Sequence, residues 1–184
     1  MGQKTERIFD RAIANLEEDN HENALRLFNE ILNREPRHLE ALRSKALIKI
    51  SSGKTDEAED FLLFAIEQQP QDSQLHQMLG TLYLNSGSPE KAFAPLKRAA
   101  EINPFNDTAH YGLGLLYGQF QGDHQKAASH FTKAIEISEA SAEAYFSRAC
   151  SFMILQKMEE AERDFQQADK LNHPEAKEMI KEYF

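Results

Sequence analysis

The sequence predicts an all-α solenoid, which is a stack of antiparallel helix pairs, and the main observation behind this is a fixed repeat. Three prolines that close successive units lie 34 residues apart, at Pro36, Pro70 and Pro104. Each proline follows an alanine by 12 residues, and the alanines are Ala24, Ala58 and Ala92. A constant period in this range indicates a stack of like units rather than a single globular core.

Five units are expected, followed by a capping helix. We place the units at about residues 5–38, 39–72, 73–106, 107–141 and 142–173, and the capping helix at 174–184. The chain is therefore predicted to be one elongated domain over residues 1–184. The first unit is the most degenerate, as expected for a terminal repeat.

Each unit carries small residues, which let two helices approach, and large apolar residues, which fill the space between them. The first and second units carry Ile8, Ala12, Ala24, Phe28 and Ile31, then Leu42, Ala46, Gly53, Ala58, Leu62 and Ala65. The third carries Leu79, Gly80, Tyr83, Gly87, Ala92, Leu96 and Ala99. The fourth carries Leu113, Gly114, Tyr117, Gly122, Ala127, Phe131 and Ala134, with one extra residue before Gly122. The fifth carries Tyr145, Ala149, Phe152, Ala161, Phe165 and Ala168.

Capping residues and prolines predict where the helices begin and end. Asp72, Asn106 and Ser141 are placed to cap the first helices of the third, fourth and fifth units. Ser88 followed by Pro89 is a strong start signal for a second helix. The prolines at the unit ends stop each second helix, because proline cannot continue it.

The last ten residues read as an amphipathic helix that covers the final unit. The residues expected to face the solenoid are Ala176, Met179, Ile180 and Phe184. The residues expected to face water are Lys177, Lys181 and Glu182.

The third unit comes nearest to the pattern W-x2-L-G-x2-Y, A-x3-F, P, since it has Leu79-Gly80, Tyr83, Ala92 and Pro104. Five units agree in register with that pattern, so nearly the whole chain resembles the tetratricopeptide repeat (TPR) family. The resemblance implies a right-handed superhelical solenoid and a non-catalytic scaffold. It also implies a concave groove, lined by the first helix of each unit, that binds a peptide or helical segment of a partner protein.

The groove residues implied by the resemblance form two rows that are unusually apolar for an exposed face. The first row is Phe9, Arg43, Gln77, Tyr111 and Phe146, and the second is Ile13, Leu47, Thr81, Leu115 and Cys150. A third row is expected to pack mainly against the next unit: Leu16, Ile50, Leu84, Gly118 and Met153. We expect Phe9, Tyr111 and Phe146 to be at least partly exposed.

Acidic residues on the groove rim allow two interpretations. They are Glu6, Asp10, Glu17, Glu40 and Glu143. They are either a solvated charged face or a complement to a basic, amphipathic partner segment. A chaperone carboxylate-type C-terminal peptide is disfavoured, because only Arg43 among the positions of that family site carries a positive charge.

Gly112 and Gly118 in one predicted helix also have two interpretations. If both face the groove, they leave a notch beside Tyr111 that accepts a bulky partner side chain. Otherwise they simply weaken the helix, by about 1 kcal/mol each relative to alanine.

Composition and spacing exclude several classes of function. A net charge of −9 argues against nucleic acid and anionic membranes. The seven histidines do not form a metal set, and His76 and His110 are expected to pack between helices. The lone Cys150 excludes an intrachain disulfide, and no spacing suggests a catalytic group, a metal or a cofactor. The start of the chain lacks a signal-peptide segment, so a cytoplasmic protein is expected.

Two alternative functions stay open at this point. The chain could be a self-assembling scaffold that forms homo-oligomers through its groove or an exposed end. It could also be a regulatory TPR fragment of a larger protein.

Overall fold

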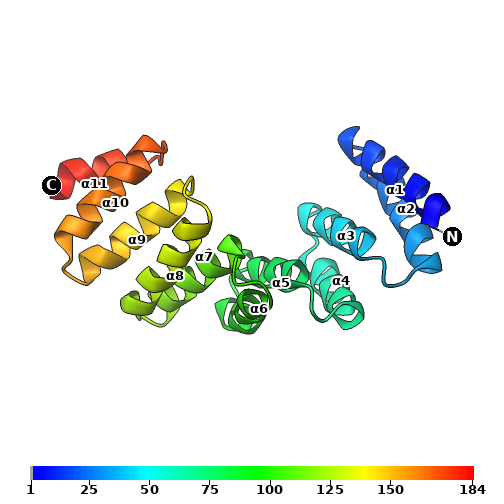
Figure 1. Cartoon of the computed structure of the whole chain (residues 1–184), viewed down its shortest axis with the longest axis horizontal. Coiled ribbons are helices and arrows are strands. Elements are labelled where there is room, and N and C mark those ends of the chain that lie inside the picture. Colours follow the sequence, from blue (N-terminus) through cyan, green and yellow to red (C-terminus); the bar gives the residue numbers. More distant parts are fainter. Residues whose placement is uncertain (1) are drawn as a thin grey trace.

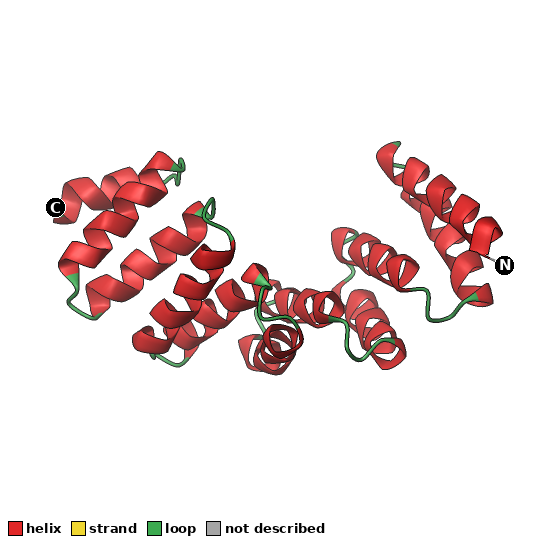
Figure 2. Ribbon diagram, viewed as in Figure 1, coloured by secondary structure: helices red, strands yellow, loops and turns green. Residues whose placement is uncertain are grey.

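The computed structural model describes residues 2–184 and is, over that range, entirely helical (Figures 1 and 2). Five antiparallel helix pairs follow one another along an arc, and a terminal helix follows the fifth pair. The pairs are α1 (Gly2–Glu17) and α2 (His21–Arg34), α3 (Leu39–Ser51) and α4 (Thr55–Gln68), α5 (Ser73–Asn85) and α6 (Pro89–Ile102), α7 (Asp107–Leu115) and α8 (His124–Ile137), and α9 (Ala142–Ile154) and α10 (Met158–Lys170). The terminal helix is α11 (Ala176–Tyr183), and a π-helical turn, η1 (Leu116–Phe120), follows α7. The solenoid fold expected from the repeat is thus confirmed.

The small residues of the repeat lie where paired helices touch. A Cβ atom on Gly80 would lie 2.4 Å from Cγ of Leu96, and one on Gly114 would lie 2.5 Å from Cε1 of Phe131. Buried side chains join α3 to α7 in one continuous cluster, and a second cluster joins α1, α2 and α3. The core is therefore a ribbon along the solenoid, as expected for stacked repeats.

Helix starts follow the predicted caps. The side chains of Asp72, Asn106 and Ser141 each accept a hydrogen bond from the backbone N–H three residues on, at 2.8, 2.9 and 3.3 Å. Ser88 and Pro89 also stand at the predicted helix start, although the Ser88 side chain makes no capping bond. Pro36, Pro70 and Pro104 each stand two residues beyond the end of a second helix.

The capping helix packs as its pattern predicts. Ala176 is buried, and Met179 and Ile180 are half-buried against the cluster around Phe165. The ring of Phe184 lies 6.3 Å from the ring of Phe165, although 43% of Phe184 remains exposed.

The second helix pair has lysines at two positions where the third repeat has large apolar or aromatic residues. Lys45 and Lys49 stand where the third repeat has Leu79 and Tyr83. The ammonium group of Lys45 lies 4.4 Å from the ring centre of Phe61, and burial together with Lys49 lowers the pKa of Lys45. Lys49 forms an ion pair with Glu57. α3 and α4 also contact each other less extensively than α5 and α6 do.

The extra residue of the fourth repeat is absorbed by the π-helical turn η1. The backbone N–H of Gln121 donates to the carbonyl of Leu116, five residues earlier, at 3.2 Å. Single π-turns of this kind accommodate one inserted residue within a helix and are common at functional sites. Gly122 then ends the helix at φ +66°, close to the φ of +71° that Gly87 has in the third repeat. The inserted turn carries Gly118, and the chain beyond it regains the repeat geometry.

Two histidines meet between α7 and α8. His110 Nε2 lies 3.1 Å from the carbonyl of Pro104 and must donate there, which leaves His110 Nδ1 to accept from His130 Nδ1 at 3.2 Å. His130 also stacks on Tyr117 with ring centres 5.3 Å apart. Burial lowers the pKa of both histidines, and the pKa of His130 falls to about 4 with added contributions from His110 and Lys133.

We expect the chain to lose stability as the pH falls from about 6.5 towards 4. In that window the unfolded histidines bind protons that the folded pair does not, so the stability present above pH 6.5 is lost on acidification. The measurement is the urea midpoint at pH 7.5 and pH 5. His130→Phe keeps the stacked ring and removes one titrating group, so its midpoint should change less. An equal change of the urea midpoint in wild type and in His130→Phe would show that protonation of His130 does not cause the loss of stability.

Candidate functional site

The first helices of the pairs form the inner side of the arc. In Figure 1, α3 and α5 lie inside their partners α4 and α6. Of the ten predicted groove residues, nine are half-buried and Leu47 is 52% exposed. The partial exposure predicted for Phe9, Tyr111 and Phe146 is therefore found.

At the N-terminal end, Phe9 and Ile13 rest on the first repeat. The ring of Phe9 lies 5.8 Å from the ring of Phe28 and 5.7 Å from that of His38, on which it stacks. Ile13 packs against the cluster of α1, α2 and α3. Phe9 and Ile13 therefore present partly exposed apolar side chains at this end of the groove.

The middle of the groove is polar. Arg43 is paired with Asp72, the N-cap of α5, and so joins the second repeat to the third. Gln77 Nε2 donates to Thr81 Oγ1 at 3.3 Å. Arg43 and Gln77 line an open depression of about 320 Å³ together with Thr108 at the start of α7. The charge of Arg43 is neutralised within the chain, so it is mainly a structural residue.

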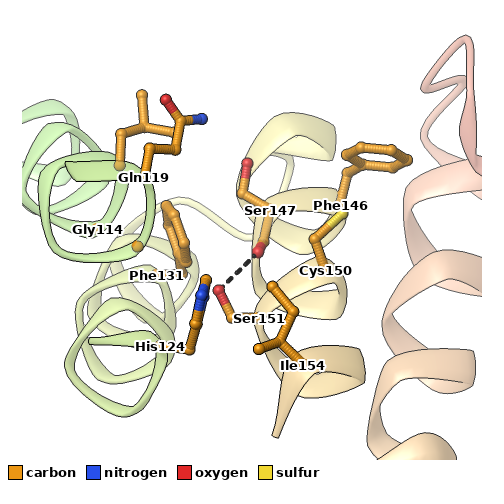
Figure 3. A pocket seen from close by; sticks show the side chains of 11 residues that line it. Gly114, Gln119, His124, Phe131, Phe146, Ser147, Cys150, Ser151 and Ile154 are labelled. Carbon is orange, nitrogen blue, oxygen red and sulfur yellow. Dashed lines mark hydrogen bonds between the residues drawn. The ribbon is translucent and has the colours of Figure 1, made fainter. Parts of the chain in front are cut away.

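At the C-terminal end, the structure brings three predicted residues into one pocket. Leu115, Phe146 and Cys150 line a cavity of about 240 Å³ between α7, α8 and α9. Figure 3 shows Phe131 and His124 facing Ser147, Cys150 and Ser151 across it. The hydroxyl of Ser151 donates to the carbonyl of Ser147 at 3.1 Å.

Aromatic contacts fix the groove residues beside this pocket. The ring of Tyr111 lies 5.7 Å from that of Phe131. Phe146 meets the edge of Phe165 at 5.3 Å and stacks on His173 at 3.9 Å with an interplanar angle of 10°. Both groove aromatics are therefore held in place by buried rings.

The notch beside Tyr111, which required both glycines to face the groove, is not formed. Gly112 is buried, and a Cβ atom there would lie 2.8 Å from Cδ1 of Leu96 and 3.3 Å from Cδ1 of Leu84. Gly112 is thus a contact between repeats and opens no space in the groove. Gly118, by contrast, lines the pocket.

Sequence reasoning missed His124, Phe131, Ser147 and Ser151 as pocket residues. His124 and Phe131 come from α8, a second helix, which the groove pattern did not include. The Nδ1 atom of His124 is the one buried side-chain nitrogen or oxygen that lacks a hydrogen-bond partner within residues 2–184.

The charges of the site are acidic at the rim and neutral at the thiol. All five rim carboxylates are exposed, although Glu143 lies 3.2 Å from His173 Nε2 and Glu40 lies 3.6 Å from Arg43. Burial raises the pKa of the Cys150 thiol. Arg148 cannot offset this because its guanidinium is bound to Asp164.

Residues 2–184 contain no cluster of three or more histidine, cysteine or acidic side chains arranged for a metal ion. Within the same range, no helix combines the length and the apolar character needed to cross a bilayer.

Three family models, each described as a tetratricopeptide repeat, match residues 15–82, 77–141 and 142–173. Among curated proteins, the chain is 32% identical over 92 residues to Tetratricopeptide repeat protein 37 of Xenopus laevis. That match covers 47% of this chain and 6% of the relative, so the chain spans a small part of that protein.

Solved structures show the same fold. A crystal structure of MamA superposes with a TM-score of 0.74 at 24% identity and covers 96% of both chains. YrrB, described as a TPR protein with an unusual peptide-binding site, superposes with a TM-score of 0.74 at 21% identity and covers 95% of this chain and 90% of its own.

Proposed function

Since the chain belongs to the tetratricopeptide repeat family, we propose that it is a non-catalytic scaffold that binds a peptide or helical segment of a partner protein in its concave groove. The main support for the proposal is the partial exposure of apolar side chains on the inner surface of the arc. Aromatic and aliphatic side chains from successive first helices are only half-buried there in the free chain. Partly exposed apolar side chains at both ends of the groove, with a polar stretch between them, are typical of an interaction surface.

The best support comes from Leu47, which is 52% exposed on α3, between the apolar N-terminal residues of the groove and its polar centre. A leucine in this position gains burial only when another chain covers it. The structural likeness to YrrB, whose description names a peptide-binding site, agrees with a peptide as the bound form.

The rim chemistry favours a basic and amphipathic segment. The carboxylates of Glu6, Asp10 and Glu17 are exposed on the first helix. Basic residues of a partner would meet them at the rim, while its apolar side chains lie along the groove. Acidic C-terminal peptides would be repelled by the same charges.

We expect Leu47→Ala to weaken binding of a groove peptide by about tenfold, because the substitution removes the most exposed apolar contact of the groove. The peptide is one selected against the wild-type chain from a displayed library, and the measurement is calorimetric titration. Leu63→Ala is the matched control, since Leu63 is 44% exposed on α4, the outer helix of the same pair. Both variants should keep the wild-type free energy of unfolding within about 0.5 kcal/mol. Equal affinity of both variants and wild type would refute groove binding.

The role of the rim is tested by salt in the same titration. Raising the salt from 0.05 M to 0.5 M should weaken binding by roughly tenfold if the carboxylates contact basic residues. Binding that does not change with salt would mean that apolar contacts in the groove hold the partner and that its basic residues do not contribute. Mass that rises with protein concentration, and is lowered by Leu47→Ala, would instead identify a second copy of the chain as the occupant.

A further inference from the structure

One row of side chains along the solenoid is large and apolar in every repeat except the fourth. In the first, second, third and fifth repeats its members pack against the core clusters, and they are Leu16, Ile50, Leu84 and Met153. The fourth repeat has Gly118 at this position. The side chain that the other repeats supply here is therefore absent from the fourth.

The junction between the third and fourth repeats shows what that side chain does. Leu84 reaches across to the next repeat, where its Cδ1 lies 3.3 Å from the place of a Cβ atom on Gly112. One repeat further on, Gly118 has no side chain to extend, and Ser147 stands in the place of Gly112. Gly118 and Ser147 both line the pocket of about 240 Å³. The pocket therefore lies where an aliphatic side chain packs one repeat earlier.

The size and walls of the pocket suit an uncharged apolar side chain. An apolar cavity of about 150 Å³ is enough to hold a benzene molecule, so this volume can hold a leucine side chain. Leu115, Phe131, Phe146 and Ile154 supply apolar surface to the wall. Within residues 2–184, no carboxylate, lysine or arginine lines it. A charged side chain that entered would lose its hydration without gaining a counterion.

The pocket is continuous with the groove and lies near two carboxylates. Phe146 and Cys150 belong both to the predicted groove rows and to the pocket wall (Figure 3). Glu143 is exposed about one helical turn before Phe146 on α9. Glu175 is exposed as well, and its charge adds to the effect of burial in raising the pKa of the Cys150 thiol. A segment that lies along the groove would bring one side chain over the pocket and its neighbours close to these carboxylates.

Resting on the proposed function, we propose that this pocket holds a leucine side chain of the partner segment, in the place that Leu84 fills between the third and fourth repeats. The occupant is a large aliphatic side chain with a basic residue beside it, which meets Glu143 and Glu175. Burial of the aliphatic side chain contributes affinity because its apolar surface leaves water. Alanine would be too short to contact the walls and would lose that contribution.

The test is a double-mutant cycle with the peptide selected against the wild-type chain. Each leucine of the peptide is replaced in turn by alanine, and every peptide is titrated calorimetrically into wild type and into Gly118→Leu, which restores the side chain of the row. One replacement should weaken binding to wild type on the order of twentyfold. Against Gly118→Leu the same replacement should cost less than about twofold, because the pocket is already filled. Gly118→Leu should bind the unmodified peptide about tenfold more weakly than wild type does.

A control variant and a second readout complete the test. Gln121→Leu adds a leucine to the same turn at an exposed residue outside the pocket, and it should bind the peptide as wild type does. Alkylation of Cys150, the single thiol of the chain, reports occupancy in wild type without any substitution. At saturating concentrations, the selected peptide should slow alkylation more than the peptide that lacks the critical leucine. This readout decides the question even if Gly118→Leu does not fold.

Two results would overturn the proposal. In the first, no leucine of the peptide couples to residue 118, so that every replacement costs the same affinity in wild type and in a folded Gly118→Leu chain. In the second, the saturating peptide leaves the alkylation rate of Cys150 unchanged, or all the replaced peptides protect the thiol equally well. Groove binding has its own test in Leu47→Ala, so a peptide that depends on Leu47 but not on the pocket would leave groove binding standing.

Discussion

Phe28→Ala is expected to lower the free energy of unfolding by about 3–5 kcal/mol, among the largest effects of any single substitution in this chain. Phe28 is fully buried between α1 and α2, and its ring supports the groove residue Phe9 from below at 5.8 Å. Alanine removes that apolar surface from the core and leaves a cavity that two rigid helices cannot close. The measurement is urea unfolding followed by circular dichroism.

Two further variants show whether burial causes the effect. Phe28→Leu should cost much less, because Leu62 and Leu96 occupy the same position in the second and third repeats. Phe64→Ala, at a phenylalanine that is 43% exposed on α4, should change stability by less than about 0.5 kcal/mol. A loss for Phe64→Ala as large as that for Phe28→Ala would contradict the assigned core.

Asp164→Ala is expected to cost a similar amount, about 3–5 kcal/mol, for an electrostatic reason. Asp164 accepts two hydrogen bonds from Arg148, at 2.7 and 2.8 Å, and joins α9 to α10. The two side chains are only 9% and 16% exposed, respectively. Alanine would leave the guanidinium inside the fifth repeat with Thr132 as its remaining partner at 3.0 Å. A desolvated charge without its counterion is strongly destabilising.

The matched control removes both charges. The third and fourth repeats have Leu79 and Leu113 at the position of Arg148. The double variant Arg148→Leu with Asp164→Ala should therefore recover most of the lost stability, since no unpaired charge remains. A double variant that is less stable than Asp164→Ala would show that Arg148 stabilises the chain through contacts other than its pair with Asp164. An unpaired charge would then not explain the loss.

Most of the fold could be predicted from local signals that repeat. Proline spacing set the period, and Asp72, Asn106 and Ser141 marked helix starts, because capping depends on residues only three positions apart. Lys45 and Lys49 could not be recognised as core substitutions without aligning the second repeat to the third. Their packing depends on Phe61 and Glu57 in the partner helix, which supply the compensating contacts.

The site was less predictable because its residues meet across helices. The groove rows follow from the repeat, but Gly112 was misplaced, since only the contact with Leu96 shows that it faces a neighbouring repeat. His110 and His130 lie on different helices, so the spacing of histidines within a helix could not reveal their contact. The pocket likewise depends on what Gly118 lacks relative to Leu84, and on side chains from three helices.

The most direct test of groove binding is photo-crosslinking from two exposed leucines on opposite sides of one repeat. A benzophenone is attached to Leu47→Cys on inner helix α3 or to Leu63→Cys on outer helix α4, each in a Cys150→Ser background. Each labelled protein is then irradiated with the selected peptide, and the adducts are quantified by mass spectrometry. Groove binding predicts an abundant adduct from position 47, competed away by unlabelled chain, and little from position 63. Equal adducts from both positions, or a stronger one from position 63, would contradict it.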